Sequence, residues 1–351
     1  MSRLLEVEGR RTYAQAGVSI EAGEAAVARY APAAAVARRP EVLAGLGGFA
    51  GLFALPARYR DPVLVASADG VGTKLEVARL AGRFNTVGID LVAMLVDDLV
   101  CVGAEPLFVL DYVAVGALDP ARVAEVVAGV AEGCRRAGAA LLGGETAEHG
   151  GVMKPDDLDL AGFAVGVVER EGRLGAHRVV VGDALVGLHS PNLRSNGFSL
   201  AREVLLDEPG ALERPAYPGA TATLAEVALE PSVIYAPGVR ALGERLGAAL
   251  HAAAHVTGGG IVGNVVRVLA EGQRAEIDLA AFPTPEIFFE IQRRGPVGAE
   301  EMVRVFNCGL GMVLAVERAS AATSLEVLAA AGYPASVVGE VVAGERGVSV
   351  R

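Results

Sequence analysis

Positive charge is scarce in this chain. Its 351 residues carry a formal net charge of −11, and lysine and arginine form no basic stripe, which argues against a nucleic acid as partner. No uninterrupted apolar stretch approaches the roughly 20 residues that span a bilayer, so we expect no membrane partner either.

Cysteine is also rare. Cys101, Cys134 and Cys308 are odd in number and lack the spacing of metal ligands or of a CxxC motif, which indicates reduced thiols. The segment from Met1 to Glu6 becomes charged too early for a signal peptide. Together these features predict a cytoplasmic protein.

Two familiar phosphate-binding motifs are missing or misplaced. The chain contains no GxxxxGK[ST] segment, which excludes a P-loop enzyme. Residues 45–50 match GxGxx[GA], but they follow Arg38-Arg39-Pro40 rather than an apolar strand, and no suitable acidic residue ends a second strand about 20 residues later. We therefore expect no dinucleotide fold, and this loop either lies against a phosphate or is simply flexible.

The chain is long for a single hydrophobic core, which predicts two domains. Alternating strand and helix patterns predict α/β layers in each half, and charge and glycine at 169–173 suggest a linker between domains 1–170 and 171–351. The expected helices cover 20–39, 86–102, 119–137, 198–206, 260–271 and 319–331. The expected strands cover 62–67, 107–113, 159–168, 184–188, 311–316 and 336–342, with a short one ending in a turn at 143–146.

The segment Ala68–Leu75 is the most informative stretch. It follows an apolar strand and supplies a carboxylate, two glycines, a hydroxyl and an ammonium group, which are the parts that hold a magnesium-bound phosphate. Lys74 is notable because the chain has only one other lysine, Lys154. The alternative is an ordinary turn between strand and helix with a surface lysine.

The expected helix at 86–102 carries acids within an apolar sequence. Asp90 and Asp97 share one face, and Asp98 lies beside it. Acids in so apolar a helix need a partner, and a metal ion or a lysine would serve. The alternative is a set of acids on the helix surface.

Three further segments have the chemistry of ligand sites. Glu145 follows two glycines at a strand end, although a capping box would explain it equally. Ser195-Asn196-Gly197 and Thr257-Gly258-Gly259-Gly260 each precede an expected helix, whose free N–H groups can hold an anion. His255 lies beside the second of these segments, where a functional role competes with a structural one.

In order and spacing these segments resemble the phosphoribosylformylglycinamidine cyclo-ligase (AIR synthetase) family, nearly end to end. The resemblance implies two α/β domains: an N-terminal mixed sheet that pairs with a second subunit into a barrel, and a C-terminal α/β sandwich. Further segments that carry it are Tyr13–Val18, Gly47-Gly48-Phe49, Gly88–Met94, Gly103–Pro106, Gly143–Glu148, Asp159–Phe163, His255–Gly260 and Phe306–Met312.

The resemblance also implies the reaction, which is ATP-dependent closure of formylglycinamidine ribonucleotide to aminoimidazole ribonucleotide (AIR), performed by a homodimer with Mg²⁺ and with K⁺ as an open question. The implied catalytic residues are Lys74, Asp98 and His255, and the implied metal ligands are Asp69 and Asp98, with Asp90 or Glu145 in support. The implied ATP-binding residues are Gly47, Gly48, Phe49, Asp69, Gly70, Gly72, Thr73, Lys74, Gly144, Glu145 and Thr146. The implied substrate-binding residues are Arg194, Ser195, Asn196, Gly197, Thr257, Gly258 and Gly259.

Four positions depart from the family pattern, among them Ala50, which replaces a common glycine, and His149, which replaces a common methionine. Arg194 stands where the family usually has histidine, and a guanidinium cannot act as a base near neutral pH. Asp97 replaces a usual asparagine and adds negative charge beside Asp98. The alternatives are another member of the ATP-binding superfamily (formylglycinamidine synthetase, selenophosphate synthetase or thiamine-phosphate kinase) and a nucleotide-binding protein without catalysis.

Overall fold

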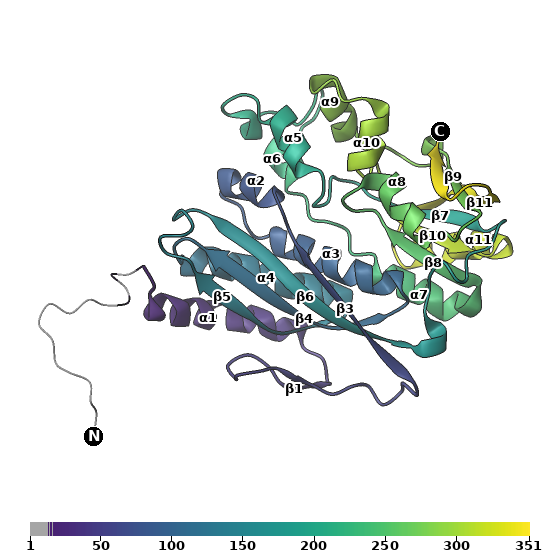
Figure 1. Ribbon diagram of the computed structural model, residues 1–351. Helices are drawn as coiled ribbons and strands as arrows, with labels where there is room; N and C mark the ends of the chain where they lie inside the picture. The colour runs from purple at the N-terminus through teal and green to yellow at the C-terminus, as the bar shows by residue number, and fades with distance from the viewer. Residues whose placement is uncertain (1–12, 14, 16) are drawn as a thin grey trace, which may run out of the picture.

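The computed structural model describes Tyr13, Gln15 and residues 17–351, so the Tyr13–Val18 segment lies partly outside the described residues. The chain builds two main β-sheets, each with its own helices, and helix α3 (Val87–Cys101) lies at the junction between them (Figure 1). A small third sheet pairs β1 (Val42–Ala44) with β2 (Leu52–Phe53).

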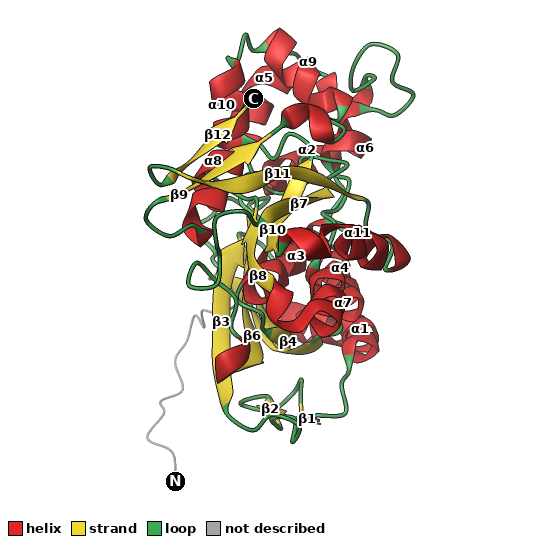
Figure 2. Ribbon diagram, turned by 90° about the vertical axis from the view of Figure 1, so that its right-hand side faces the viewer, coloured by secondary structure: helices red, strands yellow, loops and turns green. Residues whose placement is uncertain are grey.

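The N-terminal sheet has four strands in the order β3-β6-β4-β5. β4 and β5 run parallel and the other neighbours antiparallel, which makes the sheet mixed. Helices α3 and α4 cover one face and α1 packs against α4, so that strands and helices form separate layers (Figure 2). The elements are α1 (Ile20–Ala34), β3 (Pro62–Gly70), α2 (Lys74–Ala81), β4 (Glu105–Val115), α4 (Pro120–Ala137), β5 (Ala140–Glu148) and β6 (Leu158–Glu169).

Local sequence accounts for helix α4 and for its contact with α3. Asp119 caps the helix by accepting a hydrogen bond from the Ala121 N–H at 2.8 Å, and Gly138 ends it with a φ of 69°. The two helices approach closely at Gly88, where a Cβ atom would lie 2.2 Å from the Val130 nitrogen. Only glycine fits there.

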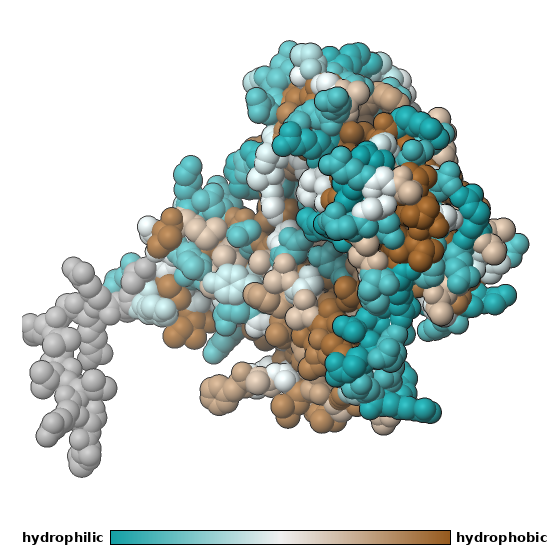
Figure 3. Space-filling view, turned by 45° about the vertical axis from the view of Figure 1, so that its right-hand side comes forward, coloured by the Kyte–Doolittle hydropathy of each residue, from teal (hydrophilic) through white to brown (hydrophobic). Residues whose placement is uncertain are grey.

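The other face of this sheet carries no helix layer. Leu64, Tyr112 and Phe163 lie on it with 65%, 37% and 53% of their surface exposed. Figure 3 shows brown, hydrophobic side chains in the lower, sheet-bearing part of the molecule. A sheet face with large exposed apolar side chains is typical of a surface that contacts another protein.

The C-terminal sheet has six strands in the order β12-β9-β11-β7-β10-β8, all antiparallel neighbours except β12 and β9. Within the described part of the chain, none of the helices combines the length and hydropathy needed to span a membrane. The strands are β7 (Ala184–His189), β8 (Leu250–His255), β9 (Gln273–Ile277), β10 (Leu310–Val316), β11 (Ala335–Ala343) and β12 (Gly347–Val350). The helices are α5 (Phe198–Leu205), α6 (Leu224–Ala228), α7 (Ala236–Leu246), α8 (Gly260–Val265), α9 (Glu286–Arg294), α10 (Ala299–Val305) and α11 (Ala321–Ala330).

The expected mixture of helices and strands is confirmed, with four corrections. The helix expected at 20–39 ends at Ala34 and continues only as a 3₁₀ turn to Ala37. The helix expected at 260–271 ends at Val265 and continues only as a short 3₁₀ turn. β3 runs on through Asp69 to Gly70, and β5 continues through 143–146 where a turn was expected. Gly144 permits that continuation, because a Cβ atom there would lie 1.6 Å from an Asp111 carboxylate oxygen.

Glu105, at the start of β4, ties the segment around β1 and β2 to the sheet. Its carboxylate accepts hydrogen bonds from Arg39 at 2.9 Å, from Tyr59 at 2.5 Å and from Arg58, and its side chain is 6% exposed. Burial alone would raise the pKa of Glu105, but the hydrogen bonds from Arg58, Tyr59 and Arg39 lower it to about 2. The folded protein therefore favours the charged form.

This depressed pKa predicts an acid-dependent loss of stability. The unfolded pKa is about 4.3, so the contribution of Glu105 is present above that pH and is lost as the pH falls toward the folded value. We expect Glu105→Gln to lower the free energy of unfolding by about 3 kcal/mol at neutral pH, and the difference from wild type to shrink below about pH 4. Urea unfolding followed by circular dichroism measures both. A difference that stays constant with pH would contradict the prediction, and Glu244→Gln, at an exposed neighbour, is the control.

Candidate active site at the domain junction

Helix α3 carries the acidic residues of the site. It packs against the N-terminal sheet on one side and against α7 and β8 on the other. Asp90 and Asp97 are fully buried, whereas 45% of the Asp98 side chain is exposed. Buried carboxylates require charged or hydrogen-bonding partners. The partners of these three come largely from outside the helix.

Asp90 forms an ion pair with Lys74 at the start of α2. The ammonium lies 2.7 Å from the Asp90 carboxylate and 3.0 Å from each of the carbonyl oxygens of Arg194 and Glu230. Ser232 donates to Asp90 from its backbone N–H at 2.8 Å and from its hydroxyl at 2.5 Å. Because an ammonium group has three N–H donors, all of those on Lys74 are in use.

This geometry corrects two predictions. Lys74 was expected to contact ATP phosphates and Asp90 to support a metal ion, but both side chains are fully buried and bound to each other. Burial lowers the pKa of Lys74, and the charge of Asp90 opposes that shift. The lysine is thus the partner that the acidic, apolar helix required, and its contacts with Arg194 and Glu230 connect the pair to the C-terminal half.

Asp97 forms a second buried ion pair, with Arg194 at 3.1 Å. Its other oxygen accepts the backbone N–H groups of Tyr235 at 2.8 Å and of Ala236 at 2.9 Å, where α7 begins. Burial raises the pKa of Asp97, and the charge and hydrogen bond of Arg194 oppose that rise. Only 1% of Arg194 is exposed, so it does not face substrate as predicted.

Asp69 and Asp98 lie close to each other on the accessible side of the junction. Partial burial raises the pKa of Asp69, and the negative charge of Asp98 raises it further. Asp98 lies 2.9 Å from Nδ1 of the buried His255 and 3.4 Å from the Ser67 hydroxyl. Strand β3, helix α3 and strand β8 thus bring Asp69, Asp98 and His255 together.

This pair of carboxylates fits a magnesium ion that arrives with a nucleotide. Mg²⁺ keeps several water ligands and takes one or two protein carboxylates together with phosphate oxygens. Burial is the main cause of the raised pKa of Asp69, and the repulsion from Asp98 that adds to it is what a cation between the two groups would relieve. Across residues 17–351, no group of three or more His, Cys, Asp or Glu side chains is arranged to hold a metal ion.

A loop with the features of an anion site adjoins this network, because Arg194, which precedes the loop, contacts His255. Ser195-Asn196-Gly197 leads into α5, which has no side-chain cap, so its first N–H groups stay free. The Ser195 hydroxyl and the Asn196 side-chain oxygen are buried without a partner, which suits contact with a ligand. The Thr73 hydroxyl lies 3.2 Å from that of Ser199 in α5, so the predicted phosphate segment adjoins this loop. A Cβ atom on Gly258 would lie 3.9 Å from the Asn196 side chain, which brings Thr257-Gly258-Gly259 alongside.

The remaining predicted ATP-binding residues lie elsewhere. The sheet register aligns Asp69 with Gly162, Gly162 with Asp111 and Asp111 with Gly144, which places β5 three strands, or about 14 Å, from β3. Within one chain Glu145 therefore does not share a cation with Asp69 and Asp98, and that prediction is corrected. Thr146 lies on the same distant strand, and a separate cavity of about 560 Å³ is lined by Gly47, Gly48, Phe49, Gly144 and Glu145 among others.

Two polar residues that the sequence analysis passed over are central to the site or its surroundings. Asn264 donates to the carbonyl oxygens of Thr257, Gly258 and Gly260, and so shapes the second glycine loop. Asp111 lies in the wall of the 560 Å³ cavity, and burial raises its pKa to about 7. The carboxylate within an otherwise apolar strand was the available signal for Asp111.

Comparison with known proteins assigns the family. The family model described as AIR synthase related protein, N-terminal domain, matches residues 50–168, and its C-terminal counterpart matches residues 180–351. A phosphoribosylformylglycinamidine cyclo-ligase from Myxococcus xanthus is 52% identical over 336 residues, which are 95% of this chain and 96% of that protein. One from Sorangium cellulosum is 50% identical over 94% of this chain and 95% of its own length.

Solved structures share the fold at lower identity. Thiamine-monophosphate kinase from Stenotrophomonas maltophilia is 21% identical and superposes with a TM-score of 0.63 over 93% of this chain and 95% of its own. Hydrogenase maturation protein HypE in complex with ATP is 17% identical, with a TM-score of 0.63 over 90% of this chain and 88% of its own. The two matched domains and the full-length relatives show that this chain belongs to the AIR synthase related family and, within it, to the phosphoribosylformylglycinamidine cyclo-ligases.

Proposed function

We propose that this chain catalyses the ATP-dependent closure of formylglycinamidine ribonucleotide to 5-aminoimidazole ribonucleotide in de novo purine biosynthesis, with release of ADP and phosphate. Its relatives at about half identity are named for that activity and match it over nearly their whole length. The observation within the molecule that carries the proposal is the pairing of Asp69 and Asp98 beside the loop Ser195-Asn196-Gly197.

The reaction requires both parts of this site, the carboxylate pair and the loop beside it. An amide oxygen leaves poorly, so the γ-phosphoryl group of ATP is first transferred to it. The amidine nitrogen then attacks the same carbon, the new C–N bond closes the ring, and the C–O bond breaks to release phosphate as a proton leaves the nitrogen. Phosphoryl transfer depends on positioning and on neutralising charge. When bound, Mg²⁺ would supply that neutralisation.

Named residues divide this work. Asp69 and Asp98 would hold the magnesium ion, and the backbone at Gly70 and Gly72 with the Thr73 hydroxyl would contact the ATP phosphates. The second substrate would lie across the anion-binding loop. There the unpartnered Ser195 hydroxyl, the Asn196 oxygen and the free N–H groups of α5 would bind its phosphate and amide, alongside Thr257-Gly258-Gly259.

The test is a turnover assay with formylglycinamidine ribonucleotide and Mg·ATP, without glutamine or ammonia. The expected result is aminoimidazole ribonucleotide and ADP in equal amounts. Turnover only with another phosphoryl acceptor, such as thiamine phosphate, would overturn the proposal in favour of another superfamily member. Tight ATP binding without any ADP release would favour a binding protein.

A second copy of this chain fits the uncovered face of the N-terminal sheet, and we propose a homodimer that pairs these faces into a barrel. The exposed Leu64, Tyr112 and Phe163 would supply an apolar interface. We expect Phe163→Asp to halve the mass measured by sedimentation equilibrium, because burying a carboxylate there has a high cost. Val180→Asp, at a C-terminal site with 52% exposure, should leave the mass unchanged. A dimer that survives Phe163→Asp would contradict this interface.

A further inference from the structure

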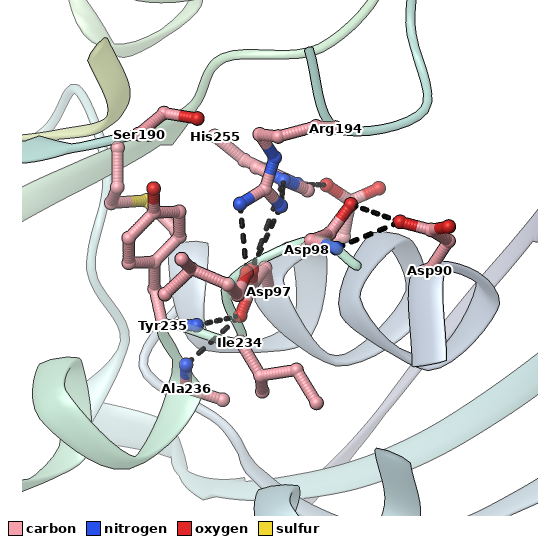
Figure 4. A network of polar contacts seen from close by, with 12 residues as sticks. Asp90, Asp97, Asp98, Ser190, Arg194, Ile234, Tyr235, Ala236 and His255 are labelled. Carbon is pink, nitrogen blue, oxygen red and sulfur yellow. Dashed lines mark hydrogen bonds and ion pairs between the residues drawn. The ribbon is translucent and has the colours of Figure 1, made fainter. Parts of the chain in front are cut away.

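Arg194 connects His255 to Asp97 in a buried network at the junction. One terminal nitrogen of its guanidinium lies 2.8 Å from Nε2 of His255 and 3.1 Å from the Asp97 carboxylate, and the other donates to the Val233 carbonyl at 2.8 Å. Figure 4 shows the guanidinium above Asp97 and beside the imidazole ring. The ring of Tyr235 lies 4.8 Å from the guanidinium carbon, which closes the network on that side.

These contacts determine where the proton of the His255 ring lies. A guanidinium only donates hydrogen bonds, so Nε2 must accept one from Arg194 and carries no proton. Asp97 is not an alternative partner for an Nε2 proton, because its oxygen is 3.9 Å away. The single ring proton is therefore on Nδ1, where it donates to the Asp98 carboxylate at 2.9 Å.

We propose that Arg194, held in place by Asp97, is a positioning residue: it keeps His255 as the neutral Nδ1–H form, and that proton orients Asp98 toward the magnesium-bound phosphates of the nucleotide. The proposal rests on the phosphate site of the proposed function. It also changes the role expected of His255. A ring whose two nitrogens are both engaged orients a carboxylate and has no proton free for the substrate.

The two partners depend on each other. Arg194 and Asp97 both depart from the pattern that the resemblance implies, and the structure places them in contact at 3.1 Å. Both are almost fully buried, so either one alone would leave an unpaired charge in the protein interior. The carboxylate of Asp97 is thus the counterion of the Arg194 guanidinium, and the two act as a unit.

The first test is the histidine side-chain ¹⁵N–¹H NMR spectrum of the full-length protein, with His255→Asn used to assign the signal among five histidines. The expected result is a His255 ring protonated at Nδ1 and unprotonated at Nε2. In Arg194→Met/Asp97→Asn, which removes both buried charges together, the ring should populate both tautomers. A wild-type ring protonated at Nε2 would overturn the proposal.

The second test is the affinity for Mn²⁺, used as the probe for Mg²⁺, in the presence of a non-hydrolysable ATP analogue and measured by electron paramagnetic resonance. Loss of a residue that orients a metal ligand typically weakens metal binding 10–100-fold, so we expect a dissociation constant at least about tenfold higher in the double variant. Wild-type affinity in a folded double variant would show that Arg194 is only the counterion of Asp97, and would overturn the proposal. Arg135→Met, at an exposed arginine of α4, is the control.

Neither readout requires turnover, so the two proposals can fail separately. A protein with the expected tautomer and Mn²⁺ affinity that forms no aminoimidazole ribonucleotide would refute the proposed function alone. A protein that forms the product with an Nε2-protonated His255 would refute the positioning role alone.

Discussion

Lys74→Met is expected to lower the free energy of unfolding by about 3–5 kcal/mol, because it leaves the buried carboxylate of Asp90 without its counterion. The change also removes the donors to the Arg194 and Glu230 carbonyl oxygens, which lie on loops of the C-terminal half. Urea unfolding followed by far-ultraviolet circular dichroism measures the loss, since the chain has no tryptophan to report by fluorescence.

The other lysine of the chain offers a matched control. Lys154 is exposed, so Lys154→Met should change the stability by no more than about 0.5 kcal/mol. The double variant Lys74→Met/Asp90→Asn removes both buried charges and keeps an acceptor for Ser232, so it should recover a large part of the loss. If Lys74→Met were as stable as wild type but failed to bind ATP, Lys74 would be a phosphate ligand and its buried pairing would be wrong.

The need for such partners is visible in the sequence, but their identity is not. Helix α3 has three acids among apolar residues, and that pattern alone demands a counterion. Asp97 and its partner Arg194 are 97 positions apart, and their meeting depends on how two domains pack. Local propensity contains no information on that contact. The same limit explains why Lys74, in a motif typical of phosphate binding, was expected to contact ATP phosphates rather than Asp90.

Strand prediction failed where burial overrides propensity. Strand β8 contains Ala252, Ala253 and Ala254, and alanine favours strands only weakly. These residues form a strand because they pair with β10 and are buried. Helix ends were more predictable, since Asp119 and Gly138 act through their own neighbouring backbone. Sequence motifs therefore predicted which residues belong to the site. Strand pairing and the packing of the two domains determine which of these residues lie together.

Asp98→Asn is expected to reduce turnover by about 10²-fold or more while leaving the stability nearly unchanged. Its side chain is 45% exposed, and an amide oxygen can still accept the hydrogen bond from His255, so the fold loses little. The loss of one negative charge instead weakens the hold on the magnesium ion, whose stabilisation of the developing charge amounts to several kcal/mol.

The measurement is kcat at saturating formylglycinamidine ribonucleotide over a series of Mg²⁺ concentrations, with thermal unfolding run in parallel. Asp156→Asn, at an exposed carboxylate, controls for the change in net charge and should match wild type in both assays. Because Asp98 and Lys74 belong to the same predicted catalytic set, the two variants separate its members. Asp98→Asn should lose activity with its stability intact, and Lys74→Met should lose stability. If Asp98→Asn kept the wild-type kcat at low Mg²⁺, Asp98 would not be a magnesium ligand. Asp69 would then lack its proposed partner in the metal site.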